Sequence, residues 1–317
     1  AAGYDIAVPG NNDFSLEREY PGQFEKLAGM AHYITIAANM YRADSEGNST
    51  GELVFDPYVI LTTARGSRLG LFGLAMLGGG SDQADPDSEY NYFSRDDMVT
   101  CNDMVAELGE LGCGTIIGIG HKGWSEIPTT QDIISGLTQT ITRLVEDADP
   151  VLETEEAEQG PGGPPPGGGY NSGILASVVE GMDVLVDGHS HSVIENGLGW
   201  RSDLGCLVVQ SGEKGNVVGV VKIYLKDGQF VKAVADLLDQ NDLRAFPADP
   251  EAQAVVDAVY ARFEEDTARP VGETPYFLNA NRLSGNNGER GIRTDEQNLG
   301  DIVTDAIRWK LGADVAF

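Results

Sequence analysis

The stretches TIIGIGH (residues 115–121) and DVLVDGHSH (residues 183–191) decide the fold class, because each runs a short apolar segment into a Gly-His turn. A continuous apolar run of this length is typical of a strand that is buried on both faces of a sheet. Open α/β sheets build their sites at the carboxyl ends of such strands, and glycine lets the backbone turn sharply there. We therefore expect His121, His189 and His191 to lie at the carboxyl ends of two strands.

Strand and helix patterns alternate along the rest of the chain. Apolar runs typical of strands occur at residues 4–8, 33–37, 59–62, 68–74, 115–119, 183–186, 207–209 and 217–225. Apolar positions three and four residues apart predict helices over residues 22–29, 96–111, 131–148, 174–180, 250–269 and 299–311. This alternation favours an α/β layered domain. The turn Asp227-Gly228 between residues 217–225 and 230–235 predicts a hairpin that closes this domain.

Composition excludes several classes of protein. The 317 residues include 50 acidic and 21 basic side chains, which gives a formal charge of −29, and no Lys/Arg cluster offers a face for a nucleic-acid backbone. No apolar run is long enough for a transmembrane helix. The negative charge has two readings, a solvated acidic surface or a divalent-cation site. The acidic run at residues 153–158 lacks the glycine-punctuated loop of an EF-hand, so we interpret it as a solvated face.

Oxygen ligands follow a third predicted strand. Residues 4–8 end in Gly10-Asn11-Asn12-Asp13, which adds amide and carboxylate groups to the two Gly-His turns. His189 and His191 are separated by one residue, so in an extended turn they diverge and suit two neighbouring metal ions better than one. His32 has no motif around it, which favours a structural or surface role.

Cysteine usage leaves the redox compartment open. Cys101, Cys113 and Cys206 are odd in number and form no Cys-x-x-Cys motif, so their disulfide status stays open. Cys101 and Cys113 fit best as small buried apolar side chains at the helix over residues 96–111.

Several segments, taken together and in order, resemble one known family, the calcineurin-like metallophosphoesterases, and within it the 5′-nucleotidase branch. The segment LGCGTIIGIGHKG resembles the family's strand whose terminal His binds metal, and VEGMDVLVDGHSHS is similar to its Gly-His-x-His block. The segment RTDEQNLGDIVTDAIRW looks like the opening of that branch's C-terminal domain. The other matching segments are GYDIAVPGNNDF, YITIAANM, SRLGLFGLAML and LVVQSGEKGNVVGVVKIYL.

The resemblance implies a layered metallophosphoesterase fold followed by the beginning of a 5′-nucleotidase C-terminal domain. Residues 1–240 would form the metallophosphoesterase domain, incomplete at its N-terminus, with a flexible acidic and Gly/Pro-rich insertion at about 149–172. Residues 241–273 would be a linker and helix, and residues 274–317 the truncated start of the second domain.

The resemblance also implies a two-metal centre for the complete family site, with Zn, Mn or Fe. Asn11, His121 and His189 would bind one ion and His191 the other. The resemblance implies a phosphomonoesterase or cyclic phosphodiesterase that hydrolyses nucleotides or related small phosphate esters with an activated water. Its location would be extracellular, periplasmic or at the cell surface.

Departures from the family pattern favour a second hypothesis. The family's Gly-Asn-His-Asp/Glu block reads Gly10-Asn11-Asn12-Asp13 here, so Asn12 stands where the family has its catalytic His, and Asp13 loses the side chain that it would orient. Losing general acid help typically costs about 10²- to 10⁴-fold in rate. The family's N-terminal Asp-x-His and Gly-Asp motifs also have no counterpart, so we expect one ion or none in this chain. The alternative is therefore a catalytically impaired module with a binding or structural role at the cell surface.

Overall fold

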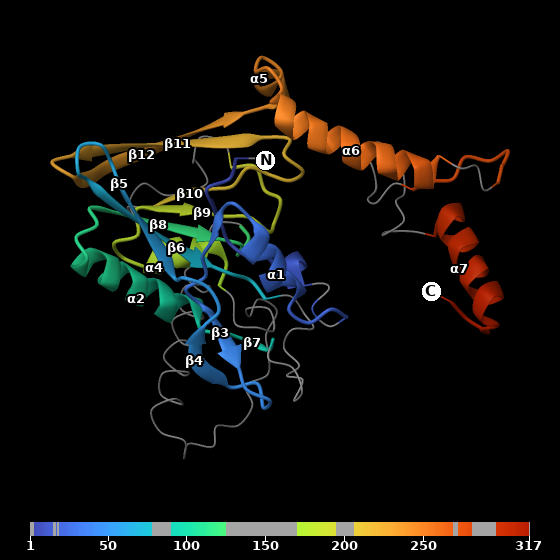
Figure 1. Cartoon of the computed structure of the whole chain (residues 1–317), viewed down its shortest axis with the longest axis horizontal. Helices are drawn as coiled ribbons and strands as arrows, with labels where there is room; N and C mark the ends of the chain where they lie inside the picture. Colours follow the sequence, from blue (N-terminus) through green and yellow to red (C-terminus); the bar gives the residue numbers. More distant parts are fainter. Residues whose placement is uncertain are drawn as a thin grey trace. The chain divides into compact units, whose positions relative to one another are not determined.

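The computed structural model of the protein describes residues 3–14, 17, 19–77, 90–124, 170–194, 206–268, 272–280 and 296–316 (Figure 1). The chain divides into two compact units, Ala1–Ala248 and Asp249–Phe317. The helix expected at residues 131–148 lies outside the described residues, as does most of the insertion expected at about 149–172.

A five-stranded sheet forms the centre of the first unit. Its strand order is β10-β9-β8-β6-β5, and every neighbouring pair is parallel except β5 with β6. These strands are β5 (Tyr58–Thr62), β6 (Arg68–Leu74), β8 (Thr115–Gly120), β9 (Val184–Val186) and β10 (Leu207–Val209). Because the strands carry apolar side chains on both faces, the sheet needs a covering layer on each side.

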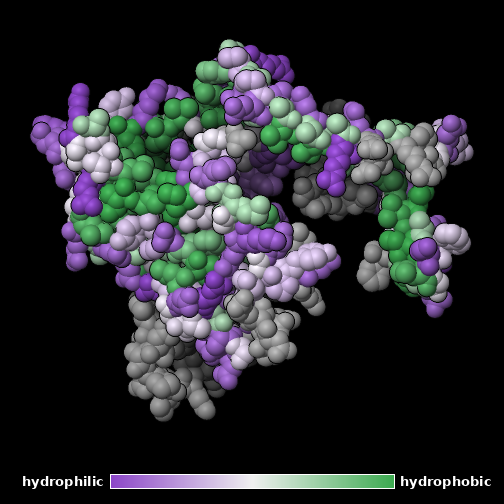
Figure 2. Space-filling model, in the orientation of Figure 1, coloured by the Kyte–Doolittle hydropathy of each residue, from purple (hydrophilic) through white to green (hydrophobic). Residues whose placement is uncertain are grey.

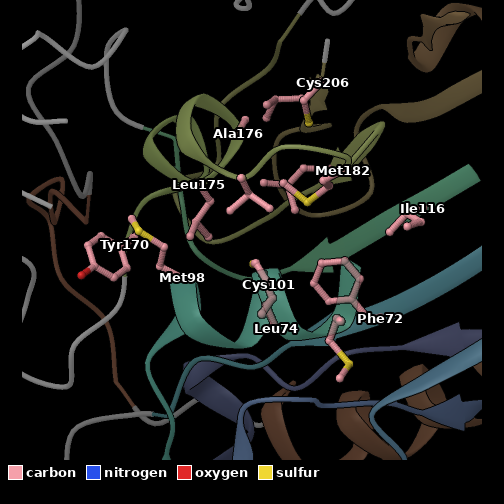
Figure 3. Close-up of a cluster of buried hydrophobic side chains, with 14 of the residues drawn as sticks. Phe72, Leu74, Met98, Cys101, Ile116, Tyr170, Leu175, Ala176, Met182 and Cys206 are labelled. Atoms are coloured by element: carbon pink, nitrogen blue, oxygen red, sulfur yellow. The ribbon is translucent and has the colours of Figure 1, made fainter. Parts of the chain in front are cut away.

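Helices cover one face of this sheet and a hairpin covers the other (Figure 1). The helix α2 (Asp97–Glu110) packs on β6 and β8, and α4 (Ser172–Val178) packs on β10. Figure 3 shows Phe72, Leu74 and Ile116 of the sheet in this core. The hairpin of β11 (Val218–Lys226) and β12 (Gln229–Leu238) packs on the opposite face. The layered α/β architecture expected from the sequence is thus confirmed.

A smaller core lies beside the central sheet. It joins the three-stranded sheet β4-β3-β7 to the short helix α1, and its buried side chains include Phe14, Met40 and Tyr92. The elements are β1 (Ile6–Ala7), the 3₁₀ turn η1 (Asn11–Phe14), α1 (Gln23–Met30), β2 (Ile34–Thr35), β3 (Met40–Ala43), β4 (Ser49–Leu53) and β7 (Tyr92–Ser94). The three-stranded sheet was not expected from the sequence, and the strands expected at residues 4–8 and 33–37 are shorter than predicted.

The second unit is helical in the part that is described. It contains α6 (Pro250–Thr267) and α7 (Asn298–Leu311), while the short α5 (Gln240–Leu243) belongs to the first unit. Asp249 caps α6 through its carboxylate, and Gly312 ends α7 in the left-handed conformation. Both helices leave apolar side chains exposed, and Figure 2 shows those along α7. Within the described residues, no helix combines the length and the apolar character that a bilayer crossing requires.

All three cysteines are free thiols. Cys101 and Cys206 are buried in the core between the sheet and the helices, whereas Cys113 is only partly buried. Burial raises the pKa of the Cys206 thiol to about 12 and raises the pKa of Cys101 as well. Both therefore act as apolar core side chains.

Two glycines provide a matched test of the packing. A Cβ added to Gly73 in β6 would lie 2.3 Å from the backbone oxygen of Ile36, whereas a Cβ on Gly109 in α2 would meet no atom within 4 Å. We expect Gly73→Ala to lower the free energy of unfolding by about 1 to 3 kcal/mol. We expect Gly109→Ala to raise it by about 0.5 to 1 kcal/mol. Chemical denaturation measures both, and equal effects from the two variants would contradict the packing described here.

Candidate functional site

Three loops meet at the carboxyl ends of β1, β8 and β9. His121 directly follows Gly120, the last residue of β8, and His189 follows β9 after Asp187 and Gly188. Asn11 begins the 3₁₀ turn η1 that follows β1. The loops therefore bring together three of the side chains that the sequence singled out.

One ring nitrogen of His121 and one of His189 lie close to the side-chain oxygen of Asn11. The Oδ1 atom of Asn11 lies 3.0 Å from Nε2 of His121 and 3.2 Å from Nδ1 of His189. The two imidazole rings stand edge to face, with their centroids 5.2 Å apart. We call these three residues the donor cluster.

Glycines make room for the His121 ring. A Cβ on Gly10 would lie 2.9 Å from the ring, and a Cβ on Gly188 would lie 3.1 Å from its Nδ1 atom. Both contacts are closer than nine in ten real Cβ contacts. The glycines of the Gly-Asn and Gly-His turns are thus required because the imidazole packs directly against their backbone.

Partial burial favours the neutral form of the His121 ring. The pKa of His121 is lowered, chiefly because the ring is removed from water and secondly because His189 lies beside it. A neutral imidazole offers a lone pair, which is the form that binds metal ions.

The donor cluster fits a divalent metal ion in its chemistry and spacing. Ligands that surround an ion tetrahedrally at 2.0 to 2.1 Å stand about 3.3 to 3.4 Å apart, close to the two distances measured from Asn11. Among the described ranges, however, no three His, Cys, Asp or Glu side chains form a group that could hold a metal ion. A site here therefore depends on the amide oxygen of Asn11 as its third ligand.

His191 makes a different contact. Its Nδ1 atom lies 3.0 Å from Oε2 of Glu213, and both side chains are partly exposed. The sequence interpretation assumed an extended turn, but His189 and His191 both have left-handed backbone, with φ of 76° and 58°. This conformation, and not alternation along an extended chain, sets where the two histidines lie.

Asn12 and Asp13 are exposed residues of η1. The carboxylate of Asp13 accepts a hydrogen bond from the backbone N–H of Gly10 at 2.7 Å, which stabilises the turn that carries Asn11. Asp13 therefore has a local structural contact in addition to any part in catalysis.

A buried ion pair formed by Lys122, the residue after His121, was not predicted from the sequence. The Nζ atom of Lys122 lies 2.9 Å from Oδ1 of Asp97 and donates to the backbone oxygen of Ala75 at 2.7 Å. Asn39 donates to the same Asp97 oxygen at 2.8 Å, and all three side chains are almost fully buried. Burial raises the pKa of Asp97, and Lys122 opposes that change. The available signal was a lysine two residues after a buried strand in a strongly acidic chain.

Two curated relatives are similar to the chain in sequence. The trifunctional nucleotide phosphoesterase protein YfkN of Bacillus subtilis is 26% identical over 149 residues, which are 45% of this chain and 9% of YfkN. A snake venom 5′-nucleotidase of Gloydius brevicauda is 23% identical over 310 residues, which are 96% of this chain and 44% of the relative. The chain spans less than half the length of either relative. No protein-family model matches it.

Two solved structures from Thermus thermophilus are similar to the chain in fold. The 5′-nucleotidase precursor has a TM-score of 0.59 at 21% identity, covering 98% of this chain and 52% of that one. The sulfate thiohydrolase SoxB also has a TM-score of 0.59, at 15% identity, covering 98% of this chain and 44% of that one. Because these two proteins carry different names for their reactions, the structural likeness shows the fold alone.

The buried ion pair can be tested by a double-mutant cycle. We expect Lys122→Met alone to lower the free energy of unfolding by about 3 to 5 kcal/mol, because it leaves the Asp97 carboxylate buried without its cation. Asp97→Asn in the Lys122→Met background should recover part of that loss, since the charge is then removed. Additive effects of the two changes in denaturant titrations would show that the pair is not coupled.

Proposed function

We propose that this chain hydrolyses phosphate esters of nucleotides. The premise is that its sequence and structural neighbours consistently point to the calcineurin-like phosphoesterase and 5′-nucleotidase family, although their similarity to the chain is distant. The observation that carries the proposal is the donor cluster, in which one nitrogen of His121 and one of His189 lie within 3.2 Å of Oδ1 of Asn11. These are the residues that the sequence resemblance assigns to one metal of a two-metal centre. Zn, Mn and Fe all suit their mixed nitrogen and oxygen atoms.

The chain's own groups would hold and orient the reactants. His121 presents a partly buried imidazole whose lowered pKa favours the neutral form, and the parallel strands β8 and β9 supply a rigid platform. When bound, divalent ions supply the Lewis acidity that activates water and neutralises phosphoryl oxygens. His191 is proposed to bind the second ion. Glu213 would accept a hydrogen bond from Nδ1 of His191, which leaves Nε2 as the metal ligand.

Asn12 determines whether the leaving group receives a proton. Its amide is exposed on η1 beside Asn11 and can donate a hydrogen bond to a phosphate oxygen, but it cannot deliver a proton. Hydrolysis should therefore be slow for nucleotides, whose ribose alkoxide leaves with difficulty unless it is protonated. Esters with a weakly basic leaving group should be much less affected.

The second candidate is a phosphoesterase-fold module that binds ligands without catalysis. The specific observations that favour it are Asn12 in place of the family's His and the use of Asp13 to stabilise its own turn. In both readings the proposed ligand is a small nucleotide or related phosphate ester, not a nucleic-acid polymer. The proposed location is outside the cytoplasm, supported by the likeness to a venom 5′-nucleotidase.

Metal content of the full-length protein tests the donor cluster. We expect His121→Ala and His189→Ala each to lower the bound zinc or manganese per chain, measured by elemental analysis after dialysis, because each removes one of three converging donors. His32→Ala is the matched control, since His32 is exposed and lies outside the cluster. Unchanged metal content in both cluster variants would rule out this centre.

Restoring the family's His tests the role of Asn12. We expect Asn12→His to raise hydrolysis of nucleoside monophosphates by about 10²- to 10⁴-fold, because a general acid is regained. Hydrolysis of p-nitrophenyl phosphate should rise far less, since its phenolate leaves without protonation. Equal gains on both substrates would contradict the proton-transfer argument, and no activity in either protein despite bound metal would favour the binding module.

A further inference from the structure

The turn that carries His189 and His191 is held in an unusual backbone conformation. Both histidines have positive φ, at 76° and 58°, a region that residues other than glycine seldom adopt. Such backbone persists only where neighbouring groups hold it in place. The turn also determines whether Nδ1 of His189 reaches Asn11.

Gln210 provides the contacts that could hold this turn. It directly follows β10, and only 2% of the residue is exposed. Its Oε1 atom accepts from the backbone N–H of Ser192 at 2.6 Å and from the hydroxyl of Ser190 at 2.8 Å. Its Nε2 atom donates to the backbone oxygen of Gly188 at 2.7 Å and to Asp187 at 3.3 Å. The side chain thus uses two acceptor and two donor positions, the full capacity of an amide.

The contacts of Gln210 bracket the two histidines. Gly188 and Ser190 flank His189, and Ser190 and Ser192 flank His191. The amide therefore binds the backbone at both ends of the turn, at Gly188 and Ser192, and the side chain of Ser190 between the two histidines. None of the four bonds uses an imidazole nitrogen, so Nδ1 of His189 contacts Asn11 and Nδ1 of His191 contacts Glu213. We propose that Gln210 is a positioning residue that fixes the turn so that His189 joins Asn11 and His121.

The same network extends to the loop that carries His121. Oδ1 of Asp187 accepts from the backbone N–H of Lys122 at 2.7 Å, while Oδ2 of Asp187 accepts from Gln210. Asp187 is itself buried. Gln210 therefore links the loops after β8, β9 and β10 through one carboxylate. What the positioned histidines bind rests on the proposed function, but the positioning itself does not.

The test compares Gln210→Met with Thr100→Val in the full-length protein. Gln210→Met keeps the length of the side chain and removes all four hydrogen bonds, whereas Thr100→Val removes a buried hydroxyl of α2 that has no contact with the turn. In metal-free Gln210→Met, amide hydrogen exchange at Ser192 should be roughly tenfold faster, relative to the amides of β9, because one buried hydrogen bond is lost. Thr100→Val should not change this relative rate. In zinc titrations, Gln210→Met should bind about 10- to 100-fold more weakly than the parent, and Thr100→Val should bind equally well.

Two results would overturn the proposal. One is unchanged relative exchange at Ser192 in Gln210→Met, and the other is faster exchange with zinc affinity equal to that of the parent protein. If the parent protein binds no zinc, the proposed function fails, and the exchange experiment alone then decides whether Gln210 holds the turn.

Discussion

The pairing of β8 with β9 is the constraint on which the rest of the candidate site depends. In this parallel register Ile117 lies opposite Val184 and Ile119 lies opposite Val186. Continued past the strand ends, this register sets His121 level with Gly188, which brings Gly188 against the His121 ring. A slip of one residue would exchange the two faces of a strand, bury the wrong side chains and separate the histidines. The covering layers of α2, α4 and the β11–β12 hairpin make such a slip costly.

The net charge of the chain and the pairing of Lys122 both disfavour an anionic ligand at this edge of the sheet. The chain carries a formal charge of −29, which repels anionic nucleotides at long range. Near the donor cluster the one buried cation described above, Lys122, is already paired with Asp97 and is not available to a phosphate group. Bound metal ions would add positive charge for a phosphate ester at this edge of the sheet. This is why metal binding, more than any single side chain, separates the enzyme from the binding module.

The sequence predicted the central sheet well because its strands are apolar and bounded by turns. The strands at residues 68–74 and 207–209 begin and end where expected, and the convergence of Asn11, His121 and His189 agrees with their place after strands. The strand β4 was missed because its sequence STGEL is polar and mostly exposed, with no apolar alternation. Lys122 and Asp97 were missed because their pairing depends on how α2 packs, and Gln210 was missed because its partners lie on a turn with left-handed backbone. Such contacts arise from tertiary structure and leave no periodic signal.

The most direct measurement of the central claim is X-ray absorption spectroscopy at the zinc edge on the full-length protein, loaded with about one ion per chain. The account predicts a first shell of nitrogen and oxygen at about 2.0 to 2.1 Å, with the outer-shell scattering of two imidazole rings. Loss of one ring's scattering in His121→Ala or His189→Ala would assign it. A shell of oxygen atoms alone, without imidazole scattering, would contradict the claim that Asn11, His121 and His189 form a metal centre.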